Sequence, residues 1–160
     1  MSKQTGFTLP ELIVVMIVLG ILSAVALPRM MDNRAFISAA FRADVVSALR
    51  YAQKSAVAHR RLVCATLTPT AVTLAIATNN PDSSCAIGAA LSSPDGTAYQ
   101  SKDGSVQASA VPVLPLGGLY FQPSGTITSD GAGAAIYAGR IDITGQGTWI
   151  KVEGASGYVE

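Results

Sequence analysis

Glu11 is the residue whose surroundings most restrict its chemistry. It is the only acidic residue before Asp32, and it directly precedes an uncharged, largely apolar run from Leu12 to Leu27. A carboxylate beside such a run costs a few kcal/mol unless its charge is compensated. We therefore expect Glu11 to have a partner, and the chemistry expected there is ion pairing.

The other residues of catalytic type do not form an arrangement typical of an enzyme. His59, the sole histidine, is followed by Arg60 and Arg61 at the end of a predicted helix, where a cationic cap is favoured over a general base. The chain shows no nucleophile elbow, no phosphate-binding glycine loop and no paired carboxylates. We expect no catalytic residue, no metal site and no cofactor. A membrane-tethered enzyme whose site is hidden from sequence spacing stays open as an alternative.

The apolar run is long enough to cross a bilayer. As a helix, Phe7 to Leu27 would span about 31 Å, close to the roughly 30 Å hydrocarbon core. Two other interpretations stay open: a secretory signal peptide cut after the Ala-Val-Ala sequence at 24–26, and a single-span anchor that is not processed. The position of Glu11 against the apolar run argues against a signal peptide.

The first 29 residues resemble the N-terminus of type IV pilins and of type II secretion pseudopilins. The leader Met-Ser-Lys-Gln-Thr-Gly is followed by Phe-Thr-Leu-Pro-Glu and then by the apolar run. The resemblance implies that a prepilin peptidase cuts between Gly6 and Phe7 and methylates the new N-terminus at Phe7. It also implies that Glu11 accepts the N-terminal amine of a neighbouring subunit during assembly, which would compensate its charge.

Two prolines bear on this helix. Pro10 stands where the family more often has Ile, Leu or Val, but a proline in the first helical turn costs little because its missing N–H would have had no partner. Pro28 matches a proline seen in many family members. In a helix interior it removes a hydrogen bond, so we expect a helix break or bend at Pro28.

The same resemblance implies a location and a set of partners. It implies a single-pass protein of the bacterial inner membrane with its head in the periplasm, which then enters a pilus or pseudopilus. The implied partners are other major and minor pilins, contacted through the N-terminal helices, together with the prepilin peptidase and the assembly platform. Arg29, directly after the span, opposes this topology under the positive-inside rule, but the motif is the more specific signal.

Beyond the span, charge and apolar spacing predict a second helix. The net charge of +1 hides an asymmetry, because residues 29–61 carry seven basic and two acidic side chains whereas residues 62–160 carry three and seven. One apolar stripe runs along a helix expected at 32–59, formed by Phe41, Val45, Ala48, Leu49, Ala52 and Ala56. Such a stripe must be covered, and the β-rich remainder of the chain is the available cover.

The remainder of the chain has the composition of strands and loops. We expect a hairpin from 62–67 and 71–77, then a loop region at 78–116 with at most short strands, then strands at 118–122, 134–144 and 147–153. Four aromatic residues fall at strand positions, where we expect them in the core or on a sheet face rather than as a ligand platform: Tyr120, Phe121, Tyr137 and Trp149.

The expected fold is α+β and pilin-like. A long N-terminal helix, with a membrane half and an amphipathic half, packs against a C-terminal antiparallel β-sheet head. The expected domains are a leader at 1–6, a transmembrane and assembly helix at 7–28, an amphipathic helix at 29–61 and a β-rich globular head at 62–160.

The head resembles the minor pilins of the GspH/FimT group. The similarity lies in the Tyr-Phe-Gln-Pro-Ser-Gly-Thr turn at 120–126 and in the C-terminal strands, and residues 52–64 also resemble minor pilins of mannose-sensitive haemagglutinin (MSHA) pili. These resemblances imply a minor pilin that primes or caps a fibre. A minor pseudopilin of type II secretion and a DNA-binding minor pilin stay open. The acidic balance after residue 62 argues against nucleic acid as a partner.

Cys64 and Cys85 are the only cysteines. A head outside the cytoplasmic membrane makes a disulfide the default expectation, and closing a loop of about 22 residues would stabilise the fold by roughly 3 kcal/mol. A buried reduced Cys64 or a metal site stays open, although a chain with one histidine offers few metal ligands.

Overall fold

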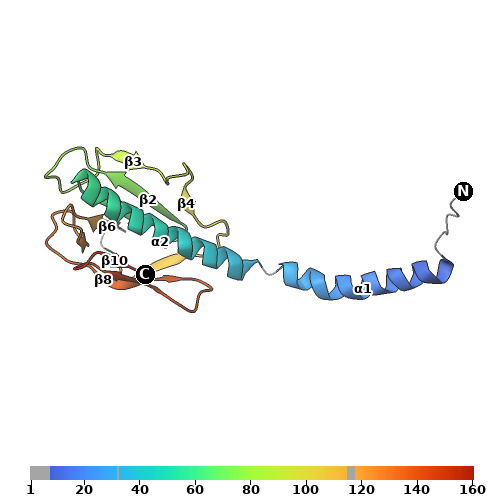
Figure 1. Ribbon diagram of the computed structural model, residues 1–160. Helices are drawn as coiled ribbons and strands as arrows, with labels where there is room; N and C mark the ends of the chain where they lie inside the picture. The colour runs from blue at the N-terminus through green and yellow to red at the C-terminus, as the bar shows by residue number, and fades with distance from the viewer. Residues whose placement is uncertain (1–7, 32, 115–117) are drawn as a thin grey trace, which may run out of the picture. The chain divides into compact units, whose positions relative to one another are not determined.

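A computed structural model of the chain describes residues 8–31, 33–114 and 118–160. The chain divides into two compact units, with the boundary between Asn33 and Arg34. The first unit holds the helix α1, and the second holds the helix α2 and the strands β1 to β10 (Figure 1). The expected amphipathic helix and β-rich head therefore form one unit, and the α+β prediction is confirmed.

The helix α1 spans Leu9–Met31. Thr8 precedes it, and the Thr8 carbonyl oxygen accepts hydrogen bonds from the backbone N–H groups of Glu11 at 3.1 Å and Leu12 at 3.2 Å. Thr8 thus occupies the N-cap position, where a threonine is favoured. The predicted cleavage residues Gly6 and Phe7 lie outside the described residues.

The helix does not end at the predicted break. It continues through Pro28 to Met31, and the next helix begins at Arg34. A proline removes one helical hydrogen bond, but the bonds before and after it still form, so the helical path can persist. The discontinuity therefore falls three residues or more after Pro28.

The helix α2 spans Arg34–His59, and its predicted stripe is confirmed. The six side chains of the stripe, from Phe41 to Ala56, are each 0–2% exposed. At its C-terminal end Arg60 adopts a left-handed conformation with φ of 51°. The Arg61 N–H then reaches the Ala56 carbonyl at 3.2 Å, which is the hydrogen bond of a Schellman motif and directs the chain into the first strand.

The first sheet is antiparallel and runs in the order β3-β2-β1-β6-β7, with β4 also paired to β2. Its centre is the predicted hairpin of β1 (Val63–Leu67) and β2 (Ala71–Ile76), in which Val63 lies opposite Ile76. The other strands are β3 (Ala89–Leu91), β4 (Tyr99–Gln100), β6 (Gly118–Phe121) and β7 (Ile127–Thr128).

A second antiparallel sheet runs in the order β10-β9-β8-β5. Its strands are β5 (Ala108–Val111), β8 (Ala138–Ile143), β9 (Ile150–Glu153) and β10 (Tyr158–Val159). The sequence predicted one sheet, and the structure has two. The short strand β5 comes from the region predicted as mostly loop, and it crosses over to pair with β8.

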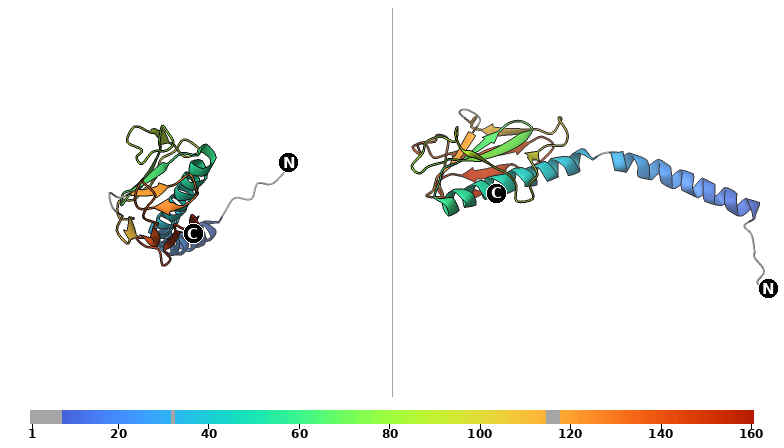
Figure 2. Two further views of the ribbon diagram at one scale, coloured as in Figure 1. Left: turned by 90° about the vertical axis from the view of Figure 1, so that its left-hand side faces the viewer. Right: turned by 90° about the horizontal axis from the view of Figure 1, so that it is seen from above.

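The core lies between α2 and the two sheets. In Figure 1, α2 runs along the head with β2, β3 and β4 on one side and β8 and β10 on the other. The right-hand view of Figure 2 shows α2 lengthwise from above. Strand positions alternate, so that Val63 and Ala65 of β1 are buried while Thr66 is exposed. The largest fully buried side chains include Phe41 and Leu49 of α2 and Phe121 of β6.

Candidate assembly site

The helix α1 exposes apolar side chains on every side. All eleven large apolar residues from Leu9 to Leu22 are 47–73% exposed. A helix that is apolar all round is stable only when lipid or other protein covers it, because such a surface is poorly solvated. The described part of α1 is therefore a surface that requires a partner.

Glu11 lies in the first turn of this apolar helix. Its Oε2 atom accepts hydrogen bonds from the Thr8 backbone N–H at 3.5 Å and from Thr8 Oγ1 at 3.4 Å. Thr8 and Glu11 thus form the Thr-x-x-Glu pattern of a capping box, in which the carboxylate returns to the start of its own helix. Proline at position 10 fits this turn, since the first backbone N–H groups of a helix need no intrahelical acceptor.

The Glu11 carboxylate has no cationic partner among the described residues. Both of its hydrogen bonds come from neutral groups of Thr8, and neither of the two ion pairs among the described residues includes Glu11. The helix N-terminus stabilises a negative charge at an exposed position by roughly 0.3–1 kcal/mol. An added cation could thus pair with Glu11 without breaking an existing ion pair.

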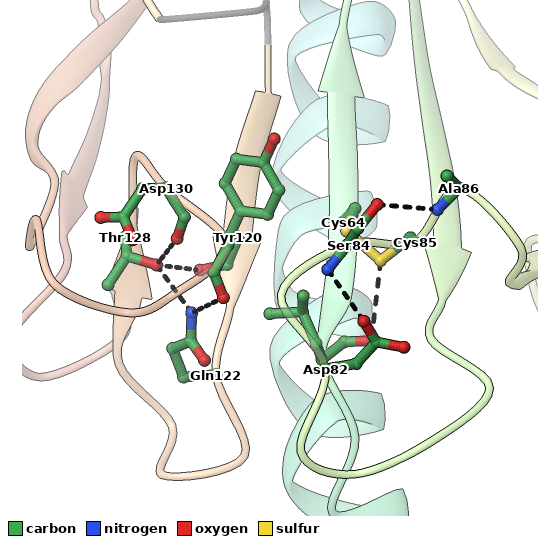
Figure 3. The surroundings of a disulfide bond; sticks show 11 residues. Cys64, Asp82, Ser84, Cys85, Ala86, Tyr120, Gln122, Thr128 and Asp130 are labelled. Carbon is green, nitrogen blue, oxygen red and sulfur yellow. Dashed lines mark hydrogen bonds between the residues drawn. A yellow bond between two sulfur atoms is a disulfide. The ribbon is translucent and has the colours of Figure 1, made fainter.

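The second unit carries the disulfide that the sequence predicted. Cys64 in β1 is bonded to Cys85, with their Cα atoms 6.1 Å apart and a sequence separation of 21 (Figure 3). The bond fastens the loop between β2 and β3 to the centre of the first sheet. Within this loop, the Ser84 N–H donates to Asp82 Oδ1 at 3.2 Å and the Ala86 N–H donates to Ser84 Oγ at 3.1 Å.

A neighbouring loop packs against the disulfide loop. Thr128 Oγ1 donates to the Asp130 carbonyl at 2.7 Å and accepts from Gln122 Nε2 at 2.9 Å, which orders the start of that loop (Figure 3). At Gly131 the backbone passes so close to the Ser83 carbonyl that a Cβ would collide with it. Only glycine fits there, so the disulfide loop and residues 129–135 form one ordered end of the head.

The remaining residues of chemical interest are spread over the head. His59 is exposed at the end of α2, and no group of three or more potential metal ligands gathers anywhere in residues 8–31, 33–114 and 118–160. Phe121 and Tyr137 are buried, as predicted, whereas Trp149 is 55% exposed and the Arg140 guanidinium lies 5.3 Å from the centre of its ring. This cation–π contact was not predicted.

Within the described part of the chain, neither helix combines the length and hydropathy that define a candidate membrane span.

Comparisons with known proteins agree with the site at the N-terminus. Residues 1–27 match a family described as the prokaryotic N-terminal methylation motif. Two fimbrial proteins of Pseudomonas aeruginosa are each 38% identical to the chain over 69 residues, covering 43% of this chain and 45% of the relative. The chain thus spans less than half the length of the curated relatives it matches. No solved structure matches it.

These comparisons and the fold point in the same direction. The match includes Glu11 and most of α1, and the chain continues into α2, which packs on antiparallel sheets. The chain is similar to type IV pilins at its N-terminus, and its α+β fold is pilin-like.

Proposed function

We propose that the protein is a minor type IV pilin, a structural subunit that enters a pilus fibre and primes or caps it. The proposal rests on the exposed apolar surface of α1: its large apolar side chains from Leu9 to Leu22 are all at least 47% exposed. A fibre supplies the missing cover when the helices of several subunits bundle together, because each helix then buries its apolar surface against its neighbours.

The precursor passes through insertion, cleavage and assembly in this scheme. The chain is inserted into the inner membrane through residues 7–28, with the head in the periplasm. A prepilin peptidase removes residues 1–6 by cutting between Gly6 and Phe7, and Phe7 is methylated. The subunit then passes through the assembly platform into the fibre, next to other major and minor pilins. The disulfide between Cys64 and Cys85 agrees with a head in an oxidising compartment.

Glu11 sets the register of the incoming subunit in this scheme. Its carboxylate is held at the helix start by Thr8 and has no ion-pair partner among the described residues. The methylated amine of Phe7 in a neighbouring subunit supplies the positive charge. Only the register that brings these two charges together is favourable in an apolar fibre core, because either charge left alone there costs several kcal/mol.

The role of Glu11 is tested by comparing Glu11→Ala and Glu11→Gln with the unchanged chain in the native host. We expect both variants to be cut between Gly6 and Phe7, while their share of the sheared fibre fraction falls at least about tenfold, because an uncompensated amine remains. Immunoblots of the membrane and fibre fractions give the ratio. Normal incorporation of Glu11→Gln would show that the carboxylate charge is not needed for assembly.

The assignment as a minor subunit rests on the likeness of the head to the GspH/FimT group and to MSHA minor pilins. A minor pseudopilin of type II secretion would use the same helix and the same Glu11 chemistry. Deletion of the chain separates the two: loss of surface fibres with normal exoprotein secretion supports the pilin. Loss of secretion with normal fibres supports the pseudopilin and contradicts the pilus role.

A further inference from the structure

A groove runs along the side of α2 that faces away from the core. One hollow of about 560 Å³ has α2 as its floor, with Pro94 of the β3–β4 loop on one side and Glu160, after β10, on the other. A second hollow of about 380 Å³ shares Arg42 and Glu160 with the first and extends to Trp149. We call the two hollows together the α2 groove.

Three cations of α2 line this groove without a carboxylate partner. They are Arg42, Arg50 and Lys54. The two ion pairs formed among the described residues join Arg140 to Asp142 and Lys151 to Glu153, so none of the three is neutralised by an ion pair within the described part of the head. The α2 groove therefore presents a row of positive charge that a ligand can meet.

Both arginines are held in place by backbone carbonyl groups. Arg42 Nη2 donates to the Trp149 carbonyl at 3.3 Å, and Arg50 Nε donates to the Val159 carbonyl at 3.0 Å. A carbonyl fixes the guanidinium without cancelling its charge. Arg42 Nε is buried and has no hydrogen-bond acceptor within the described residues. Arginine side chains fixed in this way lose little conformational entropy when an anion binds.

The α2 groove also contains one carboxylate and one exposed aromatic ring. Glu160 lines both hollows, and its Oε2 atom accepts a hydrogen bond from the Tyr158 hydroxyl at 2.9 Å. A polyphosphate strand would meet this negative charge at the middle of the groove, whereas a polypeptide can bring carboxylates to the arginines and an N–H group to Glu160. The net charge of +1 also lacks the basic excess typical of nucleic-acid binders.

We propose that the α2 groove is a docking site for an acidic segment in the head of a neighbouring pilin subunit. This inference rests on the proposed function, which brings subunit heads side by side along a fibre. Charge complementarity supports it: residues 62–160 of this chain carry seven acidic and three basic side chains, so a second subunit of like composition presents the negative partner. The contact adds a head-to-head specificity that the apolar helices alone do not provide.

Photocrosslinking in cells that assemble the fibre tests the proposal. The full-length chain carries a photoreactive amino acid at Ser47, on the floor of the α2 groove, or at Ser105, which is exposed and does not line it. We expect Ser47 to yield an adduct with another pilin, mapped by peptide mass to a segment rich in Asp or Glu, and Ser105 to yield several-fold less. The yield at Ser47 falls by about threefold at high salt, because rim charges are screened.

Charge reversal gives a matched control. The double variant Arg50→Glu/Lys54→Glu lowers the Ser47 adduct by about tenfold, since two attractive contacts become repulsive. The variant Arg61→Glu/Lys102→Glu changes the same residue types outside the groove and leaves the yield unchanged. Because Arg50 also bonds to the Val159 carbonyl, Lys54→Glu alone is the second variant, with an expected loss of about threefold. Oxidation of Cys64 and Cys85 in each variant reports folding.

Three results would overturn the docking site. They are wild-type fibres that contain the chain but give no pilin adduct at Ser47, an adduct with nucleic acid or lipid alone, and an equal loss in the control double variant. A chain that is absent from every fibre and pseudopilus preparation overturns the proposed function itself, so the two failures are distinguishable.

Discussion

The two helices of this chain differ in how their apolar surface is covered. In α1, large apolar side chains occur on every side and each from Leu9 to Leu22 is at least 47% exposed. In α2, apolar residues form one stripe whose six members are at most 2% exposed beneath the two sheets. The head thus covers its own helix α2, whereas the apolar surface of α1 needs lipid or other protein as its cover.

The charges follow the same division. The described part of α1 has a single carboxylate, Glu11, at its first turn, while the uncovered side of α2 carries Arg42, Arg50 and Lys54. The first arrangement suits an apolar environment with one compensating cation, and the second suits contact with an acidic protein surface in water. Changes in α1 should therefore affect assembly. Changes on the buried side of α2 should affect the stability of the head, and changes on its uncovered side should affect contact with a neighbouring subunit.

The largest effect is expected from a charge in the middle of α1. In the proposed function, α1 crosses the membrane before assembly, so Ile17→Arg should nearly abolish retention in the membrane and the fibre, because an arginine at the centre of a span costs roughly 3 kcal/mol. Alkaline washing of membranes and shearing of fibres, each followed by immunoblotting, measure the loss. Ile17→Leu is the control and should behave as wild type. Normal retention of Ile17→Arg, or a lower urea midpoint of the head in this variant, would contradict the distinct roles of α1 and α2.

Two phenylalanines of α2 provide the next test. Phe41 is 2% exposed and Phe36 is 76% exposed. Phe41→Ala should lower the free energy of unfolding by about 3–5 kcal/mol through lost burial and a cavity, while Phe36→Ala should change it by less than about 0.5 kcal/mol. Urea unfolding of the detergent-solubilised chain, followed by circular dichroism, gives both values. Equal effects would contradict the assignment of the buried side of α2.

The disulfide should contribute somewhat less to the free energy of unfolding than the buried Phe41 side chain does. Replacing both cysteines, as Cys64→Ser/Cys85→Ser, should lower the free energy of unfolding by roughly 3 kcal/mol in the chain-entropy treatment of a loop of this length. The same urea experiment measures it, and reduction of the wild-type chain should reproduce the shift. An unchanged midpoint would mean that the disulfide loop is equally ordered without its bond.

A smaller effect is expected at Asp95. Hydrogen bonds from the side chain of Ser93 and from the backbone and side chain of Thr97 lower the pKa of this carboxyl from 3.8 to about 2. Since the folded-state pKa is the lower one, the resulting stability is complete above about pH 4 and is lost as the pH falls through about 2. Carboxyl NMR titration should show this pKa in the wild-type chain. Ser93→Ala should raise it, and a wild-type value near 3.8 would contradict the turn geometry.

The parts of the fold that could be predicted have strong local periodicity. The stripe of α2 follows from apolar residues three and four apart, and the hairpin of β1 and β2 follows from two β-branched runs around a short turn. The pairing of Cys64 with Cys85 followed from the inferred compartment. For each, the deciding information is carried by a few neighbouring residues or by a single pair.

The parts that could not be predicted depend on distant partners. The strands β7 and β10 have two residues each, too few for a recognisable alternation, and they form because β6 and β9 offer free edges. Trp149 has the composition of a core residue, but its place just before β9 leaves it exposed under Arg140. The capping box of Thr8 and Glu11 is encoded locally as Thr-x-x-Glu, but the expectation for Glu11 concerned ion pairing alone and did not include it.

The most direct test of the account is the mass of the mature N-terminus in purified native fibres. Cleavage between Gly6 and Phe7 predicts an N-terminal peptide that begins with methylated Phe7 and contains Glu11. A mature chain that begins at Leu27, with the whole apolar segment removed, would contradict the account, because no helix would remain to carry the subunit into a fibre.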